Sequence, residues 1–388
     1  MTNASTETTP EPEAIGAIAT DDDRPGDPRP AADTAAPSDL ATDPPAAAND
    51  SNSIRATDLR MSFDGVEVIH GVSVTVEPGT IVGLIGPSGC GKTTTVRMMT
   101  GLLEPSAGSA SIGSTPSTEL SKAQRARIGY LPQTPALFPD LSLIENLSFH
   151  SSMYGLPFRR KDRLRQVLEW VELWDDRRKL VSQASGGMQR RLALAAAFVH
   201  DPDVIFLDEP TAGLDPILRE KLWNQFRDIA ETGKSMVVTT QYVGEAGKCD
   251  AVGLLSDGEM LLLDSPANLR RAAFGGEVVD VVTERPLAND ELARLSDWDF
   301  VVGEVALTAP NAVRIVVDDA DRALLDLQEA FEALGVELVE ASEYEVDYDE
   351  AFVRVVERHR DGARGAEPSA DDAADALVDD REGSPHGS

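Results

Sequence analysis

The feature that most constrains the fold is one octapeptide, Gly86-Pro87-Ser88-Gly89-Cys90-Gly91-Lys92-Thr93, which directly follows an apolar run over residues 80–85. The pattern G-x-x-x-x-G-K-[ST] between a strand and a helix is typical of a Walker A, or phosphate-binding, loop. Glycines let the backbone curl until successive N–H groups face phosphate oxygens, and a helix expected over residues 94–100 adds the positive end of its dipole. The alternative is an ordinary glycine-rich turn.

The side chains of this loop have different expected roles. Lys92 is expected to reach the β- and γ-phosphates of a nucleotide, and the Thr93 hydroxyl to ligate Mg²⁺. Cys90 is expected to contribute through its backbone, so its thiol has no predicted role. The predicted nucleotide-binding residues of the loop are Gly86, Pro87, Ser88, Gly89, Cys90, Gly91, Lys92, Thr93 and Thr94.

A second constellation is the apolar run over residues 204–207 that ends in Asp208 and Glu209. It predicts a buried strand that delivers two carboxylates to its carboxyl end, where open parallel sheets bind ligands. Asp208 would hold Mg²⁺, and Glu209 would act as the general base that polarises the attacking water. The alternative is a strand that is simply followed by an acidic loop.

Ser185-Gly186-Gly187-Met188 directly precedes another expected helix and forms a second candidate anion site. Because the chain already has one phosphate loop, we expect this site to serve the nucleotide of another copy across a dimer. The alternative is a simple helix cap provided by Ser185.

Together and in this order, these motifs closely resemble those of the ATP-binding subunits of ABC transporters, over about residues 54–270. The resemblance implies ATP and Mg²⁺ as ligands. It implies that Phe63 stacks on adenine and that Gln133 contacts Mg²⁺ and senses a membrane subunit. It also implies that Gly213-Leu214-Asp215-Pro216 is the D-loop, in which Asp215 bridges two subunits. It identifies residues 185–188 as the signature motif, although Ala184 and Met188 replace the usual Leu and Gln at its ends.

The switch position after the next expected strand departs further from the family, because Thr239-Thr240-Gln241-Tyr242 carries glutamine where histidine is usual. This pattern resembles the daunorubicin-resistance-type branch, whose members power drug or lipid-like exporters. The Gln241 amide can hydrogen-bond a γ-phosphate but cannot take up a charge. The predicted catalytic residues are Glu209, Gln241 and Lys92, and the predicted metal-binding residues are Thr93, Gln133 and Asp208.

The predicted fold class is α/β, a P-loop NTPase with an ABC-type helical subdomain over about residues 134–184, followed by a small α+β domain over residues 271–360. Strands are expected at residues 277–283, 312–317 and 336–346, and helices at 321–334 and 350–358. The small domain is interpreted as a packing or dimer-stabilising appendage, with ligand sensing as the alternative.

The charge is distributed unevenly along the chain. The formal net charge is −32, of which residues 54–270 contribute −3 and residues 271–360 contribute −14. The acidic segments 1–53 and 361–388 cannot bury enough apolar surface and are predicted to be disordered tails. Acidity disfavours a nucleic-acid partner, and the 28 Arg against 7 Lys in an acid-rich chain suggest a halophilic source. The alternative is that acidic tails inflate the charge.

Neither a membrane span nor a signal peptide is visible, so we expect a cytoplasmic protein held on the inner face of the cell membrane by separate permease subunits. Residues 137–141, which follow Gln133, are the better candidate for docking on the permease. The basic cluster Arg159, Arg160, Lys161, Arg163 and Arg165 is either a solvated helix face or a second docking surface.

The expected function is that of an energy-coupling ATPase subunit of an exporter. Two copies, in a homodimer, would close head to tail around two ATP–Mg²⁺. The alternatives are an importer ATPase subunit, or a non-transport ABC ATPase that acts on ribosomes or DNA. The latter class usually carries two nucleotide domains or a long coiled coil, and this sequence has one Walker A pattern and no heptad run.

Overall fold

The computed structural model describes residues 50–156 and 160–366. The predicted tails 1–53 and 361–388 therefore lie almost wholly outside the described residues, as does Arg159 of the basic cluster. At the start of the described region, residues 50–52 form a short 3₁₀-helix, η1 (Asp50–Asn52), and Ser53 is buried. Among residues 50–156 and 160–366, no helix combines the length and the apolar character that crossing a bilayer requires.

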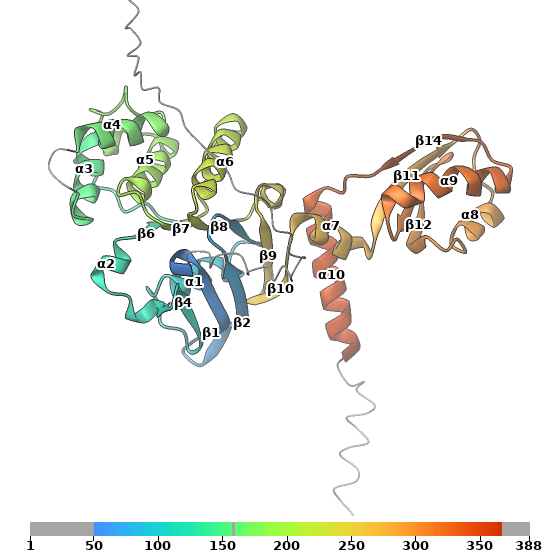
Figure 1. The fold of residues 1–388 in the computed structure, drawn as a ribbon, viewed down its shortest axis with the longest axis horizontal. Helices are drawn as coiled ribbons and strands as arrows, with labels where there is room; N and C mark the ends of the chain where they lie inside the picture. The colour runs from blue at the N-terminus through green and yellow to red at the C-terminus, as the bar shows by residue number, and fades with distance from the viewer. Residues whose placement is uncertain (1–49, 157–159, 367–388) are drawn as a thin grey trace, which may run out of the picture. The chain divides into compact units, whose positions relative to one another are not determined.

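A six-stranded sheet with the order β10-β9-β3-β8-β7-β6 forms the centre of the fold (Figure 1). Strands β6, β7, β8, β3 and β9 run parallel, and β10 joins β9 antiparallel. The inner strands β3, β7 and β8 are buried at every position, because helices or a second sheet cover both faces. The strands are β3 (Ile81–Ile85), β6 (Ile128–Leu131), β7 (Val204–Asp208), β8 (Ser235–Thr240), β9 (Ala251–Ser256) and β10 (Glu259–Asp264).

A smaller antiparallel sheet with the order β2-β1-β4-β5 covers one side of the central sheet. Helix α1 (Lys92–Met99) contributes Val96, Met98 and Met99 to the apolar cluster that joins the two sheets. Buried and exposed residues alternate over positions 72–76 of β2, so Val72, Val74 and Val76 face the apolar cluster. The strands are β1 (Ile54–Phe63), β2 (Val66–Val76), β4 (Ala107–Ile112) and β5 (Thr115–Pro116), followed by η2 (Ser117–Glu119) and α2 (Lys122–Arg125).

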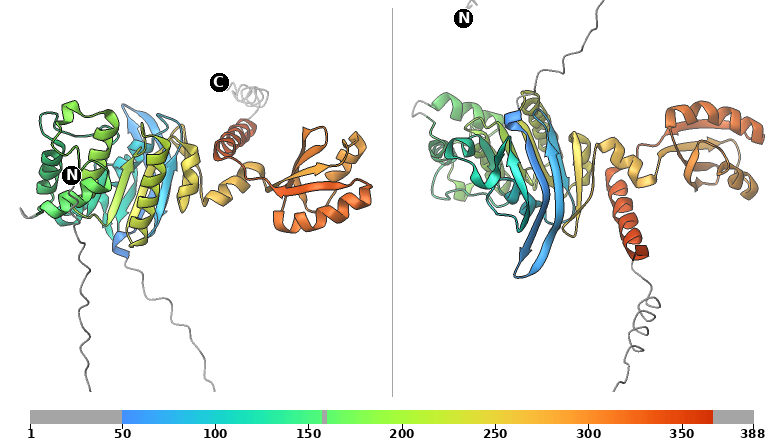
Figure 2. Two further views of the ribbon diagram at one scale, coloured as in Figure 1. Left: turned by 90° about the horizontal axis from the view of Figure 1, so that it is seen from above. Right: turned by 60° about the horizontal axis from the view of Figure 1, so that its bottom comes forward.

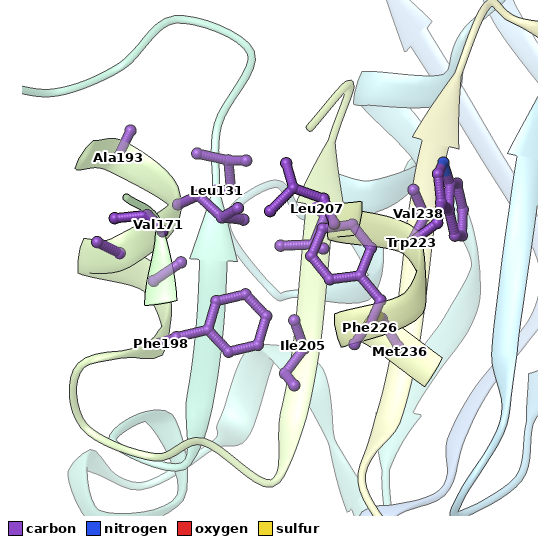
Figure 3. Close-up of a cluster of buried hydrophobic side chains, with 14 of the residues drawn as sticks. Leu131, Val171, Ala193, Phe198, Ile205, Leu207, Trp223, Phe226, Met236 and Val238 are labelled. Atoms are coloured by element: carbon purple, nitrogen blue, oxygen red, sulfur yellow. The ribbon is translucent and has the colours of Figure 1, made fainter. Parts of the chain in front are cut away.

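Helices cover the other side of the central sheet and build the larger apolar core (Figure 3). Phe198 and Phe226, from two different helices, stack with their ring centroids 6.3 Å apart against Ile205 and Leu207 of β7. Burying one such phenylalanine contributes about 1.5–3 kcal/mol. The helices of this region are α3 (Leu143–Met153), α4 (Lys161–Trp170), η3 (Val181–Gln183), α5 (Gly186–Phe198) and α6 (Pro216–Glu231).

The carboxyl-terminal part forms a four-stranded antiparallel sheet with the order β12-β13-β11-β14. Its chain order, β-α-β-β-α-β, is the split βαβ arrangement of ferredoxin-like domains. Helices α8 and α9 contact this sheet and lie along it (Figure 2). The elements are β11 (Glu277–Thr283), α8 (Asn289–Leu295), β12 (Val301–Ala309), β13 (Ala312–Val317), α9 (Ala320–Leu334) and β14 (Leu338–Glu343).

The predictions for this part are confirmed for β11 and β13, and for α9, which starts one residue earlier than expected. Two elements, α8 and β12, were not predicted. Strand β12 lies at the sheet edge, carries two register shifts and has no buried residue, so its sequence shows no clear alternation. The last helix, α10 (Tyr348–Ala366), is longer than predicted and packs on α7 (Pro266–Phe274) and η4 (Val243–Lys248).

Candidate active site

Four predicted site segments follow neighbouring parallel strands and therefore meet at one edge of the central sheet. The phosphate loop follows β3, Gln241 follows β8, Asp208 ends β7, and Gln133 follows β6. These strands are adjacent in the order β3-β8-β7-β6. The topology thus brings together residues that are up to about 150 positions apart in the sequence, at the edge where open α/β sheets bind ligands.

The phosphate loop requires its glycines for two separate reasons. Gly89 and Gly91 adopt φ values of +84° and +104°, which side-chain-bearing residues rarely adopt. A Cβ at Gly86 would lie 2.1 Å from the Leu255 carbonyl oxygen, so the loop passes too close to β9 for any side chain. The result is a curled backbone that ends at the amino terminus of α1, with Gly91 as its cap. This arrangement supplies the backbone N–H groups that a phosphate chain needs.

Lys92 is buried within this loop and is held by it. Its Nζ donates to the carbonyl oxygens of Gly86 at 2.7 Å and Pro87 at 2.8 Å. The Cys90 thiol is buried beside it, and burial raises the pKa of that thiol. A thiol that remains protonated is a poor nucleophile. This agrees with the prediction that Cys90 contributes only through its backbone.

The two acidic residues at the end of β7 differ sharply in their surroundings. The Asp208 carboxylate is fully buried and accepts hydrogen bonds from Thr93 Oγ1 at 2.8 Å and from Thr239 Oγ1 at 2.6 Å. Glu209 is only half-buried, and its φ of +53° places it in the left-handed region, which is strained for a side-chain-bearing residue. Its N–H donates to the Thr239 carbonyl oxygen at 3.0 Å.

The pair Thr93 and Asp208 suits a magnesium ion. A hydroxyl and a carboxylate that already lie within hydrogen-bond distance of each other offer the hard oxygen ligands that Mg²⁺ prefers. Mg²⁺ is usually held by one or two carboxylates together with substrate phosphates. The phosphate loop lies directly beside this pair, since Thr93 belongs to both. The residues present therefore match the ion that the sequence motifs imply.

Arg190, in the helix that follows the signature motif, connects two of the site segments. Its Nη1 donates to the carbonyl oxygens of Pro132 at 2.9 Å and Gln133 at 2.8 Å. Its Nη2 donates to those of Asp208 and Glu209, the latter at 2.6 Å. Burial lowers the pKa of its guanidinium, while the two nearby carboxylates oppose that shift. One side chain thus fixes the backbone at the carboxyl ends of both β6 and β7.

Arg190 and Thr239 were not found by sequence reasoning. Thr239 left a signal, because it is a polar residue that follows the apolar run Met236-Val237-Val238 within buried β8. Arg190 left none, since an arginine in the first turns of a helix is common and its four acceptors are backbone carbonyls. Its side chain is 6 % exposed, which only the tertiary structure reveals.

The signature segment forms the helix cap that was considered as the alternative. Ser185 Oγ accepts a hydrogen bond from the Met188 N–H at 3.3 Å, and α5 begins at Gly186. No Cβ contact restricts Gly186, and Gly187 would meet only Leu214 at 3.8 Å. The cap and the predicted role toward a partner's nucleotide are compatible, because a capped helix still presents its first N–H groups. The role across a dimer stays a prediction.

Four further predicted residues lie on the surface. Phe63, at the end of β1, is 47 % exposed. Asp215 caps α6 by accepting from the Leu218 N–H at 3.0 Å. Gln133 and Gln241 are both exposed at the carboxyl edge of the sheet. The roles of these residues toward adenine, partner subunit, metal ion and γ-phosphate stay predictions.

Comparison with known proteins supports the resemblance to ATP-binding subunits of ABC transporters. The family model described as ABC transporter matches residues 69–212. Nod factor export ATP-binding protein I of Paraburkholderia xenovorans is 36 % identical over 249 residues, which is 63 % of this chain and 82 % of the relative. The probable multidrug ABC transporter ATP-binding protein YbhF of Escherichia coli is 34 % identical over 247 residues, which is 63 % of this chain and 42 % of the relative.

Solved structures agree with these sequence relatives. An ATP-binding subunit of an ABC transporter superposes with a TM-score of 0.52 at 28 % identity, over 56 % of this chain and 92 % of that one. A dimeric ATP-binding cassette in a post-hydrolysis state, bound to ADP and Pi, gives 0.52 at 26 % identity, over 55 % of this chain and 98 % of that one. The chain therefore has the α/β P-loop NTPase fold with a helical subdomain, and it belongs to the ATP-binding proteins of the ABC transporter family.

Proposed function

We propose that this chain hydrolyses ATP with Mg²⁺ and that closure of a dimer of ATP-binding subunits powers a membrane exporter. The observation that carries the proposal is the joining of the phosphate loop to the acidic strand end through Thr93 and Asp208, beside the strained Glu209. Relatives named for Nod factor export and for multidrug transport favour export. The resemblance to the daunorubicin-resistance-type branch rests on Gln241 and remains part of this proposal.

The site residues divide the chemistry among them. The amides of the phosphate loop and Lys92 hold the phosphate chain of ATP, once Lys92 exchanges its two carbonyl acceptors for phosphate oxygens. Thr93 and Asp208, with Gln133, would hold Mg²⁺, and the bound ion would neutralise the charge that develops on the phosphates. Glu209 accepts the proton of the attacking water, and the Gln241 amide orients that water and the γ-phosphate. Phe63 stacks on the adenine.

The proposal of a dimer rests on the two separate anion-binding features of the chain. The described residues contain one phosphate loop, and the second anion-binding feature, Ser185-Gly186-Gly187, lies at the start of a different helix. In a head-to-tail pair, these three residues and Met188 would complete the site of the other copy, with Asp215 bridging the two subunits. ATP then binds the closed pair better than the open pair, and this differential affinity drives the conformational cycle.

A permease subunit is proposed to dock beside Gln133. Phe138, Phe149 and Met153 are 43 %, 42 % and 66 % exposed, and the rings of the two phenylalanines lie 4.7 Å apart. Asn146 fixes the preceding loop through the N–H and carbonyl oxygen of Phe138, at 2.8 and 2.9 Å. A neighbouring cavity of about 200 Å³ is lined by residues that include Tyr130, Pro132 and Leu137. An apolar helix of the permease matches this surface and would hold the chain at the inner face of the membrane.

The basic cluster is better explained by structure than by docking. Arg163 donates to the carbonyl oxygens of Val199 and Phe198 at 3.0 and 2.7 Å, and Arg165 pairs with Glu169 at 2.7 Å. The Arg163 guanidinium thus braces α4 against the end of α5, whereas Arg165, whose side chain is 60 % exposed, forms only an ion pair within its own helix. The small carboxyl-terminal domain is proposed to be an appendage that stabilises the subunit or its dimer.

The test is ATP hydrolysis by the purified chain, alone and with its membrane partner. We expect the wild-type chain to hydrolyse ATP in a Mg²⁺-dependent manner and Glu209→Gln to lose roughly 10²–10⁴-fold in turnover. The Glu209→Gln variant should also form an ATP-dependent dimer in size-exclusion chromatography. Wild-type turnover in Glu209→Gln, together with complete loss in Gln241→Ala, would reverse the two assigned roles.

A second assay separates transport from the other classes. Purification from membranes with a multi-span partner, and ATP-dependent efflux from vesicles that contain both, would support the exporter. ATP-dependent movement of the transported molecule toward the side of the membrane that carries the ATP-binding subunits would indicate an importer. Sedimentation with ribosomes or DNA, without any membrane partner, would overturn the transport proposal.

A further inference from the structure

Arg219, in the first turn of α6, makes three contacts in two segments around the site. Its Nη2 donates to the Leu214 carbonyl oxygen of the D-loop at 3.5 Å. Its Nε lies 3.7 Å from Glu245 Oε1 in η4. Its guanidinium carbon lies 4.2 Å from the centroid of the Tyr242 ring, in a cation–π contact. Arg219 therefore connects the D-loop with the turn that carries Gln241, because Tyr242 is the next residue in the chain.

Glu245 extends this connection back toward the acidic strand end. Its side chain is 5 % exposed, and its Oε1 accepts a hydrogen bond from Thr211 Oγ1 at 2.7 Å. Thr211 is itself fully buried and lies two residues after Glu209. A buried carboxylate is costly unless it is well paired. The burial of the Glu245 carboxylate between the end of β7 and the turn that carries Gln241 therefore needs a structural or functional explanation.

The pairing in this cluster is incomplete. Within the part of the chain that the structure describes, Glu245 Oε2 and Arg219 Nε are buried and have no hydrogen-bond partner. The separation of 3.7 Å between Nε and Oε1 is too long for a hydrogen bond and short enough for strong attraction. A cavity of about 390 Å³ adjoins the pair and is also lined by Gln241 and Tyr242. A shift of less than 1 Å would turn this ion pair into a hydrogen-bonded one.

We propose that Arg219 and Glu245 are positioning residues for ATP hydrolysis, which together set the turn bearing Gln241 against the D-loop. This inference rests on the proposed function. The D-loop bears Asp215, which is expected to meet the other subunit, so dimer closure is the event that would move Leu214 and tighten Arg219 onto Glu245. The pair then transmits closure of the dimer to Gln241, without touching ATP itself.

Arg219→Ala is the principal test, and Arg227→Ala is its matched control. Arg227 lies on the same helix and has a similar exposure. It forms an ion pair with Asp250 at 2.8 Å and donates to the Lys248 carbonyl oxygen at 2.8 Å, at the end of η4 farther from Gln241 in the chain. We expect Arg219→Ala to lower kcat by roughly tenfold or more, as small misplacements of catalytic groups do, with the KM for ATP nearly unchanged. Arg227→Ala should lower thermal stability and leave kcat near the wild-type value.

A double-mutant cycle asks whether Arg219 acts through Gln241. If it does, Arg219→Ala should cost little further turnover in a Gln241→Ala background, because the group that it positions is already absent. Arg219→Lys, which keeps the charge but not the planar stacking, should restore activity only in part. Glu245→Gln, which retains a side-chain acceptor for Thr211, should show the same kcat loss as Arg219→Ala.

Two negative outcomes have different meanings. Absence of ATP hydrolysis in the wild-type chain would remove the proposed function and, with it, the basis of this inference. Normal hydrolysis in the wild type together with equal kcat in Arg219→Ala, or fully additive losses with Gln241→Ala, would overturn the positioning role alone. Nucleotide binding measured by fluorescence titration should stay normal in every variant, which confirms that each one is folded.

Discussion

Replacing Arg190 by alanine should separate two strand ends that the wild-type side chain holds together. The guanidinium donates to four carbonyl oxygens, two after β6 and two at the end of β7. A hydrogen bond from a charged donor contributes about 1.5–3 kcal/mol, and an unsatisfied buried acceptor costs a similar amount. Against this, the variant no longer buries a charge, a cost that is visible in the lowered pKa of Arg190.

The balance predicts that Arg190→Ala loses about 2–4 kcal/mol in the free energy of unfolding, since two nitrogens share the four contacts and the desolvation cost is recovered. For a domain of about 200 residues this corresponds to a fall in Tm of roughly 4–16 °C. Urea unfolding followed by tryptophan fluorescence measures the loss. Turnover should fall as well, because Gln133 and Glu209 depend on the backbone that Arg190 fixes.

Arg191→Ala provides the control. Arg191 is the next residue on the same helix and donates to the carbonyl oxygens of Val171 and Glu172 at 3.1 and 3.3 Å. Neither acceptor belongs to a segment of the nucleotide site. Its loss should cost about 1 kcal/mol and leave turnover per folded molecule unchanged. If Arg190→Ala were no less stable than Arg191→Ala and equally active, the bridging role would be refuted.

Three further predictions concern other parts of the molecule. Gly91→Ala should abolish ATP binding in a filter assay, because φ is +104° and the new Cβ would lie 2.3 Å from Ile69 Cδ1, whereas Gly155→Ala, strained in φ but without any contact within 4 Å, should bind normally. Burial lowers the pKa of His200 to about 4, so the unfolded state takes up a proton first, and stability should fall as the pH drops from about 6.5 to 4. His200→Gln should flatten that slope in acid denaturation. Raising KCl from about 0.1 M to several molar should stabilise the chain by screening its charge of −32, and full stability in dilute buffer would contradict a halophilic origin.

The parts of the site that could be predicted from sequence are those whose chemistry is local. The phosphate loop needs glycines and a lysine at fixed spacing, and Asp208 ends an apolar run. Each of these motifs can therefore be recognised from a few consecutive residues. Adjacency of the two could also be inferred, because parallel strands bring their carboxyl ends to one edge. The hydrogen bond from Thr93 to Asp208 agrees with that inference.

The parts that could not be predicted depend on distant backbone. Arg190 is separated from Pro132 by 58 positions, and backbone acceptors carry no residue signature. The Arg219–Glu245 pair spans 26 positions and joins two elements that no motif connects. In the carboxyl-terminal domain, strand β12 was missed because it is an exposed edge strand, so burial never imposed an alternating pattern on it.

The two carbonyl oxygens that hold Lys92 have a consequence for how its variants are interpreted. In the absence of ATP, the Lys92 ammonium is bound to the carbonyl oxygens of two consecutive loop residues, Gly86 and Pro87. Incoming ATP therefore competes with the protein's own oxygens for that ammonium, which makes the loop selective for an anion of high charge density. A Lys92→Ala variant would lose the brace of the empty loop as well as a phosphate contact. The loss of ATP affinity in Lys92→Ala thus has two causes, a less ordered empty loop and a missing contact with the phosphates. Lys92→Arg keeps the positive charge but not the compact ammonium donor, so comparing it with Lys92→Ala would separate the two causes.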